Sequence, residues 1–255
     1  MVGIVVTVMM VAIDGGGGCC DVPLLDFPWP NPDEIGSLGR LKYLSLQMNN
    51  LTGQIPQSIR FLTHLQLLDL SENDLSGNVT LSIFYVSSLR IIDLGRNRIS
   101  GNLPEGFCTM LPNLQGSLPR DMWNLTKLQD LFLAGNNLTG SIPNEMENLS
   151  SIRRLSLRRN ELVGTLPSTL GNLSTLVMID IGENKICGNI PQELGHFSSL
   201  EELYLGSNML SGEVPHGIFN ISSLKVIALA ANSLSGKLPS DLVYSLPNQG
   251  TLPWD

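Results

Sequence analysis

Leucine and isoleucine recur along the chain in a pattern that repeats every 24 residues. The first clear unit places apolar side chains at Leu41, Leu44 and Leu46 and then a polar Asn49, and later units keep this order. Alternate side chains of an extended strand point to opposite faces, so Leu44 and Leu46 face inward and the residues between them face outward. The pattern predicts one short strand in each unit.

Columns of asparagine, glycine and proline define eight copies of the unit. A glycine follows the asparagine by four residues in every copy, and a proline follows it by seven in all but one. The asparagine amide can satisfy backbone groups of its own coil and the next. The glycine tolerates a tight turn, the residue before proline favours an extended step, and a short irregular or 3₁₀-like helix is expected to return the chain. The asparagines are Asn49, Asn73, Asn97, Asn136, Asn160, Asn184, Asn208 and Asn232.

One such coil cannot bury its leucines alone, whereas stacked coils share a continuous core. We therefore predict an α/β repeat fold, a right-handed solenoid with a parallel sheet on its concave face and about eight full repeats within residues 31–255. Residues 1–30 form an apolar and glycine-rich leader that we expect to be poorly ordered. Two interpretations of residues 1–13 stay open: the core of a secretory signal that lacks a positively charged start, or the ragged start of an incomplete chain.

The period breaks between Asn97 and Asn136, which lie 39 residues apart although two periods need 48, and the same fault recurs at Leu246-Pro-Asn248 near the C-terminus. The chain runs from Leu111-Pro-Asn-Leu114 directly into Gln115-Gly-Ser-Leu-Pro119, so the strand of one unit is missing. The sequence predicts one truncated repeat near residues 111–120. It also predicts eight regular strands in blocks of three and five, with distorted pairing between the strands that hold Leu94 and Leu133.

The consensus LxxLxLxxNxLxGx(I/L/V)P resembles the plant-type leucine-rich repeat. Segments such as Leu51-Thr-Gly-Gln-Ile-Pro-Gln-Ser-Ile and Gly171-Asn-Leu-Ser-Thr-Leu176 are similar to ectodomains of plant leucine-rich-repeat receptor-like serine/threonine kinases, particularly the immune pattern-recognition subgroup. The resemblance covers roughly residues 31–253. It implies a ligand-binding ectodomain fragment at the extracellular side of the plasma membrane, in signalling or defence, with a peptide or protein ligand and a co-receptor as partners. No kinase motif occurs in the chain, so no enzyme activity is expected.

Two alternatives to a receptor fragment stay open. The first is a secreted inhibitor that resembles polygalacturonase-inhibiting proteins, which share the consensus but carry cysteine caps that are not visible in this sequence. The second is a truncated product without a function of its own. Cys19 and Cys20 have neither the spacing nor the tryptophan context of a cap.

Composition and charge narrow the partners. The chain holds 45 Leu among 255 residues but only 5% aromatic residues, so its apolar burial is mostly leucine burial. A net charge of −8 leaves no basic surplus for a nucleic-acid backbone. No apolar run reaches the roughly 20 residues of a membrane-spanning helix. The cysteines and the three histidines form no metal-ligand cluster, so no metal or other cofactor is expected, and the histidines are expected on the surface.

Outward strand positions carry the candidate binding chemistry, whereas no residue is proposed as catalytic. Two arginines on either side of Ser156 project from one face and suit a carboxylate, and relatives use concave arginines to hold peptide carboxylates. The alternative is an ion-pair network between neighbouring strands, in which Arg154 pairs with Asp180 or Asp130. The candidate ligand-binding residues are Phe132, Arg154, Arg158, Asp180 and Tyr204.

Asn-x-Ser/Thr sequons occur seven times and are compatible with a secreted, glycosylated surface. Several are inherent in the repeat text Asn-Leu-Ser, so they support this interpretation without deciding it. The glycosylation candidates are Asn50, Asn78, Asn124, Asn137, Asn148, Asn172 and Asn220.

Overall fold

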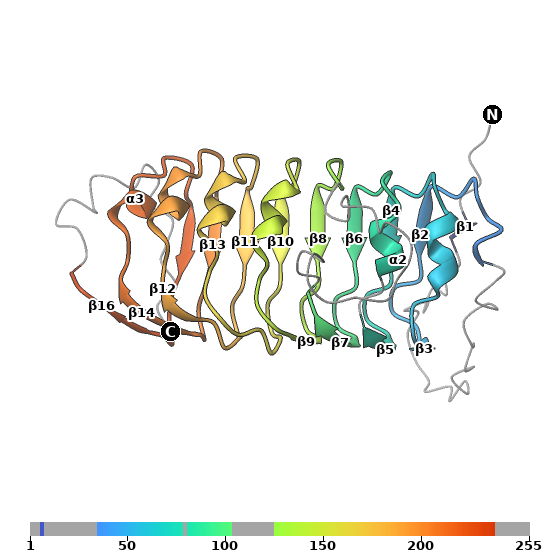
Figure 1. Cartoon of the computed structure of the whole chain (residues 1–255), viewed down its shortest axis with the longest axis horizontal. Coiled ribbons are helices and arrows are strands. Elements are labelled where there is room, and N and C mark those ends of the chain that lie inside the picture. The colour runs from blue at the N-terminus through green and yellow to red at the C-terminus, as the bar shows by residue number, and fades with distance from the viewer. Residues whose placement is uncertain (1–5, 8–34, 79–80, 104–124, 238–255) are drawn as a thin grey trace, which may run out of the picture.

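The chain forms an elongated solenoid of stacked coils that run in order from one end to the other (Figure 1). A computed structural model describes residues 6–7, 35–78, 81–103 and 125–237. Apart from residues 6 and 7, the predicted leader lies outside the described residues. The truncated repeat near residues 111–120 lies outside them as well.

A nine-stranded parallel sheet forms one side of the solenoid. Eight of its strands are the predicted repeat strands, in blocks of three and five, and the ninth, β1, pairs with β2 through Val6 and Leu44. Each repeat strand is only three residues long, because the pattern supplies one inward residue between two outward ones. In order, the strands are β1 (Val6–Thr7), β2 (Tyr43–Ser45), β4 (Leu67–Asp69), β6 (Ile91–Asp93), β8 (Asp130–Phe132), β10 (Arg154–Ser156), β11 (Met178–Asp180), β13 (Glu202–Tyr204) and β15 (Val226–Ala228).

Two further parallel sheets follow the asparagine positions, where the sequence predicts only a turn and an extended step. Glycine lies inside or directly after each of these strands at positive φ, as at Gly77 with φ 81°, a conformation that glycine adopts readily. Glycine is otherwise depleted in strands, which hides these strands in the sequence. They are β3 (Thr52–Gly53), β5 (Asp74–Asn78), β7 (Arg98–Asn102) and β9 (Asn137–Thr139), then β12 (Cys187–Asn189), β14 (Met209–Glu213) and β16 (Ser233–Ser235).

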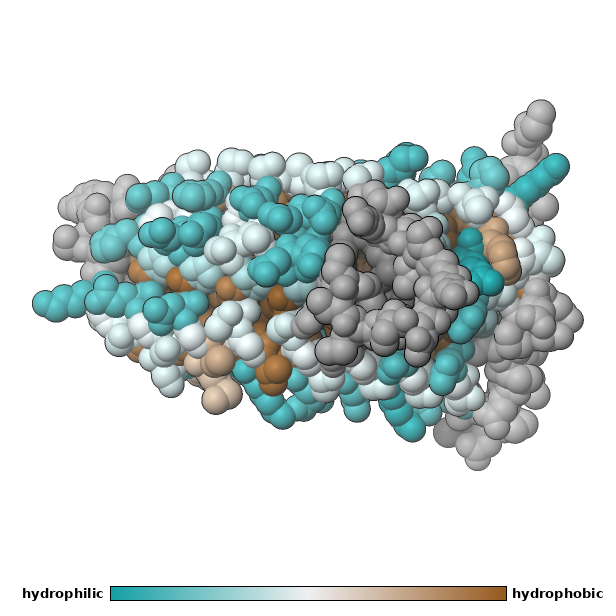
Figure 2. Space-filling view, in the orientation of Figure 1, coloured by the Kyte–Doolittle hydropathy of each residue, from teal (hydrophilic) through white to brown (hydrophobic). Residues whose placement is uncertain are grey.

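Short helices return the chain on the other side of the coils whose return segments the structure describes, as predicted. A proline in extended conformation precedes most of them, for example Pro56 with φ −62° and ψ 139°. Figure 2 shows this helix-bearing side, on which apolar patches lie between hydrophilic residues. The helices are η1 (Gln57–Phe61), α2 (Leu81–Phe84), η2 (Asn144–Asn148), η3 (Ser168–Asn172), η4 (Gln192–His196) and α3 (His216–Phe219), of which the η elements are 3₁₀ helices.

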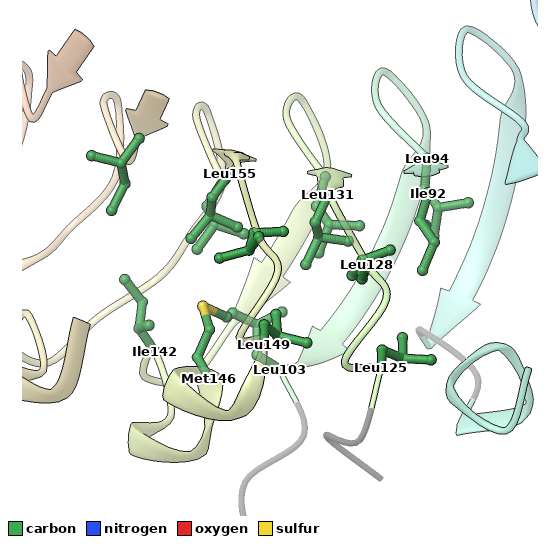
Figure 3. Close-up of a cluster of buried hydrophobic side chains, with 14 of the residues drawn as sticks. Ile92, Leu94, Leu103, Leu125, Leu128, Leu131, Ile142, Met146, Leu149 and Leu155 are labelled. Carbon is green, nitrogen blue, oxygen red and sulfur yellow. The ribbon is translucent and has the colours of Figure 1, made fainter. Parts of the chain in front are cut away.

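The hydrophobic core is one continuous cluster that lies between the sheet and the helices. In Figure 3, Met146 and Leu149 from the helix side meet Leu131 and Leu155 from the strands. Met146 and Leu155 are 0% exposed. Burying one such side chain contributes roughly 1.5–3 kcal/mol, and the same contribution recurs in every coil.

The repeated asparagines form a buried ladder along the solenoid. The Nδ2 amide of Asn97 donates to the carbonyl oxygens of Leu94 in its own coil (3.1 Å) and of Leu70 in the preceding coil (2.9 Å). Its Oδ1 atom accepts the backbone N–H of Leu75 at 3.0 Å. The ladder therefore joins each coil to the preceding one, and the predicted direction of this bond, toward the next coil, is wrong.

The predicted distortion at the irregular junction is wrong. Strand β6 pairs directly with β8 in the regular register, with Ile92 opposite Leu131. The backbone N–H of Leu94 donates to the carbonyl oxygen of Phe132 at 2.9 Å, as at regular junctions. The sheet stays regular because the coil between the two strands contains 15 residues more than one period (39 − 24) rather than lacking a strand of the stack. The extra length lies between the buried residues Leu103 and Leu125.

Candidate ligand-binding face

Four neighbouring strands bring the five candidate residues onto the outward side of the nine-stranded sheet, which we call the sheet face. Phe132 on β8 is opposite Ser156, Ser156 is opposite Asp180, and Asp180 is opposite Tyr204, so these residues share one row. Arg154 lies one row earlier, opposite Asp130. Arg158 follows just beyond the end of β10. The row spans three strand spacings, or about 14 Å.

Arg154 is held by two neighbours on β8. Its Nε and Nη2 atoms donate to the two carboxylate oxygens of Asp130 at 2.8 and 2.7 Å. Its guanidinium carbon also lies 5.4 Å from the ring centre of Phe132, which adds a cation–π contact. The Asp130 side chain is 8% exposed whereas that of Arg154 is 52% exposed. The predicted alternative, an ion pair between strands, is therefore present for Arg154, although the guanidinium still reaches solvent.

Arg158 forms a looser ion pair with Glu183. Its Nε atom donates to Glu183 Oε1 at 3.0 Å, and its Nη2 atom also contacts that oxygen. Both side chains are well exposed, at 53% for Arg158 and 40% for Glu183. Solvent screening makes such a pair worth little to stability. A ligand carboxylate can therefore replace Glu183 at small cost.

The positions beside Arg158 carry almost no side chain. In neighbouring coils they hold Ala134, Gly182 and Gly206, and the backbone N–H of Arg159 donates to Gly182 O at 2.9 Å. A Cβ atom at Gly182 would lie 3.2 Å from the carbonyl oxygen of Gly206. These small residues are consistent with the 53% exposure of the Arg158 side chain, which contacts Glu183 from the neighbouring coil.

Asp180 and Tyr204 complete the candidate site on the C-terminal side. Burial raises the pKa of Asp180, whereas a hydrogen bond from the Gly182 N–H and the nearby Arg158 lower it. Burial also raises the pKa of Tyr204, as does the hydrogen bond from its hydroxyl to Glu202 at 3.0 Å. The phenol therefore stays neutral and half-buried, with its ring in the same row as Phe132.

Comparison with protein families identifies the repeat type of this chain. The description "Leucine-rich repeat region" matches residues 108–252, which is more than half of the chain, and "Leucine Rich Repeat" matches residues 40–62 and 88–110. The chain belongs to the leucine-rich repeat family. A comparison with curated proteins finds no significant match.

Solved structures of plant receptors share the leucine-rich repeat fold with this chain. The Arabidopsis receptor kinase HAESA, in complex with the peptide hormone IDA and the co-receptor SERK1, is 30% identical with a TM-score of 0.73, over 85% of this chain and 35% of that one. A TDR receptor is 32% identical with a TM-score of 0.70, over 79% of this chain and 32% of that one. The leucine-rich repeat chain thus spans about a third of these receptors.

A plant ice-binding protein also shares the fold. It is 27% identical with a TM-score of 0.63, and the match covers 84% of this chain and 72% of that one. The fold therefore serves more than one kind of recognition, and the site has to be argued from its own residues.

The sequence missed one partner in this leucine-rich repeat site. Glu183 lies just beyond β11 in a left-handed conformation, with φ 55°. Its side chain pairs with a residue 25 positions earlier, rather than one period of 24 away, so the repeat alignment does not indicate the pair. Asp130, by contrast, lies 24 positions before Arg154, and the sequence had named it as an alternative partner.

The sequon asparagines lie away from the sheet face. Six of the seven are described, all six are exposed, and all are in helices, in the smaller sheets or in the segments beside them. Asn172, at the end of η3, donates to Glu147 at 2.6 Å. Asn124 lies outside the described residues. Glycosylation at the other six would leave the sheet face uncovered and remains a prediction.

Other chemistry is sparse in the described residues. His64, His196 and His216 are exposed, as predicted. Across residues 35–78, 81–103 and 125–237, no group of three or more His, Cys, Asp or Glu side chains could hold a metal ion. In the same part of the chain, no helix has the length and apolar character needed to cross a membrane.

Proposed function

We propose that the chain is part of a peptide-binding receptor ectodomain and that its sheet face holds an extended, acidic peptide. One observation carries this proposal: two half-exposed guanidinium groups, those of Arg154 and Arg158, project from one coil between the rings of Phe132 and Tyr204. The likeness to HAESA, a receptor kinase solved with a peptide hormone, supports the assignment.

The two arginines have different roles in this proposal. Arg158 is the primary ligand for an acidic group, because its present partner Glu183 is exposed and easily displaced. Arg154 is oriented by Asp130 and adds positive charge and a fixed guanidinium plane over Phe132. The two aromatic rings then pack against the extended peptide on either side.

The wider biological role follows the receptor assignment. We place the chain at the extracellular side of the plasma membrane, in signalling or defence, with a co-receptor as a further partner. The chain itself contributes recognition and no catalysis in this proposal. Its position in a longer receptor is supported by the share of the similar receptors that it spans, 32% and 35%.

The test is a titration of short acidic peptides with free carboxyl termini against the full chain and its variants. Replacing Arg158 by Ala should weaken binding by about 2–5 kcal/mol if the peptide carboxylate is desolvated in the complex. Glu183→Gln should strengthen binding, because it removes the competing carboxylate. Lys185→Ala is the matched control, since Lys185 pairs with Glu161 away from the sheet face.

Two results would overturn the proposal. Unchanged affinity in Arg158→Ala would assign Arg158 to a purely internal ion pair. Binding of a folded polygalacturonase with no binding of any acidic peptide would favour the secreted-inhibitor alternative instead.

A further inference from the structure

A row of cationic side chains lies at the N-terminal ends of the first repeat strands, apart from the site described above. Backbone hydrogen bonds link the row: the N–H of Gln66 donates to Lys42 O (2.7 Å), that of Arg90 to Gln66 O (2.8 Å), that of Gln129 to Arg90 O (2.8 Å) and that of Arg153 to Gln129 O (2.7 Å). Arg40 and Lys127 lie two residues before Lys42 and Gln129. We call the following residues the basic edge: Arg40, Lys42, Arg90, Lys127 and Arg153.

The positions along the basic edge hold no acidic residue, although the whole chain carries a net charge of −8. Ten positions flank the first inward residue of the five repeats from β2 to β10. Five of these hold Arg or Lys, and the others hold His64, Gln66, Ser88, Gln129 and Ser151.

The cations of the basic edge differ from six of the nine other Lys and Arg residues in the described chain, whereas Arg60, Arg159 and Lys237 likewise form no ion pair with a described residue. All five cations of the basic edge are exposed. Within the described residues none of them has an acidic partner in ion-pair range, whereas six other Lys and Arg residues each pair with a carboxylate. The same row continues to Lys225 on the β15 coil, which pairs with Glu201 at 2.7 Å. Charge along the row is thus neutralised at one end of the solenoid and left open at the other.

An apolar row of three residues runs beside the first three coils of the basic edge on the sheet face, and Asp130 on β8 follows in the same row. Tyr43, the neighbour of Lys42, is 46% exposed. It is opposite Leu67, which is in turn opposite Ile91, and both are only partly buried. A ligand that covers both rows needs anionic groups along one side and a flat, apolar face on the other. The ring of an acidic sugar offers both, because its C–H face packs on aromatic and aliphatic side chains while its carboxylate points outward.

The spacing also fits a linear polymer. Neighbouring strands lie about 4.8 Å apart, so the five coils from β2 to β10 extend over about 19 Å. Counting His64, each of these five coils carries at least one basic group. We propose that the basic edge binds a linear acidic polysaccharide, a polyuronate with one carboxylate on each sugar residue. Single exposed charge contacts are weak, so binding depends on several contacts at once and falls with added salt.

The probes are oligogalacturonate of defined length, its fully methyl-esterified form and poly-aspartate, each titrated into the full chain at low and high salt. We expect the oligogalacturonate to bind at low salt, the neutral ester to bind much more weakly and added salt to weaken binding. Poly-aspartate binding as tight as oligogalacturonate binding would overturn the polysaccharide assignment in favour of an acidic protein. Absence of oligogalacturonate binding at low salt would overturn the proposal altogether.

Variants test which residues are responsible. Arg90→Gln combined with Arg153→Gln should weaken oligogalacturonate binding about tenfold, while adding charge with Gln66→Lys and Gln129→Lys should strengthen it severalfold. Lys225→Gln is the matched control, because it removes a paired cation from the same row. Equal losses in the control and the double variant would contradict the proposal. All these residues are at least partly exposed, so melting curves should show that the variants stay folded, and acidic-peptide binding through Arg158 should be unchanged.

Discussion

The junction between β6 and β8 and the junction between β10 and β11 differ greatly in the chain that connects them but little in structure. Equivalent positions in the two coils lie 39 residues apart in the sequence at the first junction and 24 residues apart at the second. Both pairs of strands are nevertheless parallel and in the same register. Asn136 bonds Leu94 O at 2.9 Å and Ile99 N at 3.0 Å, and Asn184 bonds Leu157 O at 3.0 Å and Leu162 N at 3.1 Å.

This comparison shows that the residues around the strand, not the length of the return segment, set the stacking of coils. The leucines and the asparagine of each coil fix its position on the preceding coil. A longer return segment costs only slowly increasing loop-closure entropy. One difference remains, since the bonds from Asn136 to Leu133 O and Ala134 O are 3.2 and 3.4 Å, against 3.0 and 3.1 Å for the matching bonds of Asn184.

Removing the ladder asparagine at either junction should have the largest effect on the free energy of unfolding. Asn136→Ala and Asn184→Ala each leave one backbone N–H without its acceptor, that of Ile99 or Leu162. Each also removes three hydrogen bonds to carbonyl oxygens that keep one other donor, and together these losses should cost about 2–5 kcal/mol. Chemical denaturation of both variants measures the difference. If the irregular junction stacks as firmly as the regular one, the two losses agree to within about 1 kcal/mol. A much smaller loss for Asn136→Ala would show that the coils beside the long segment are loosely joined.

The two arginine pairs near these junctions should separate stability from binding. Arg154→Ala leaves the nearly buried Asp130 carboxylate without its partner and should destabilise the fold by about 1–3 kcal/mol. Adding Asp130→Asn should recover part of that loss. Arg158→Ala removes a pair that is exposed on both sides and should cost less than about 1 kcal/mol. Melting curves of the three variants test this, and equal losses for Arg154→Ala and Arg158→Ala would contradict it.

The sequence predicts most of this architecture because the same 24-residue pattern is written eight times. The strand positions, the asparagine ladder and the proline steps all follow from it. The placement of Phe132 and Tyr204 on the sheet face follows from the alternation of side chains along a strand. The Arg154–Asp130 pair also follows, because residues one period apart lie opposite each other in a regular parallel sheet.

The features that the sequence did not predict have physical reasons. The smaller sheets are built on glycine, which carries no strand propensity. Glu183 reaches Arg158 only because its left-handed backbone places it beside the strand end. The irregular junction keeps its regular register because stacking does not require a fixed chain length between strands, and the return segment tolerates added length. Residue counts alone therefore exaggerate the structural effect of an irregular repeat.

Asp93 on β6 and Asp180 on β11 occupy equivalent positions at the two junctions, and replacing them should have the smallest effect on stability. Asp93 on β6 accepts the N–H of Gly95 at 2.9 Å, and Asp180 on β11 accepts that of Gly182 at 3.0 Å. Burial raises the pKa of both carboxyl groups. Each has at least one neighbouring carboxylate that raises its pKa and an arginine that lowers it, but in a different order of size. Asp69 and Glu72 outweigh Arg96 at Asp93, whereas Arg158 outweighs Glu183 at Asp180.

A raised folded-state pKa means that the native protein holds the proton more tightly than the unfolded chain does. Stability therefore rises as the pH falls from neutral toward the unfolded value of 3.8, and it is lost again as the pH rises through the folded pKa. Asp93→Asn keeps the acceptor for the Gly95 N–H and removes the charge, so it should stabilise the protein at neutral pH by less than about 1 kcal/mol. The gain should shrink as the pH falls toward 3.8, because Asp93 takes up its proton over that range. Asp180→Asn should gain less, because the attraction to Arg158 is the largest charge effect at Asp180, whereas the repulsion from Asp69 and Glu72 outweighs the attraction to Arg96 at Asp93. Melting temperatures of both variants between pH 4 and 7 measure the two gains. A larger gain for Asp180→Asn than for Asp93→Asn would contradict the stronger repulsion inferred at Asp93.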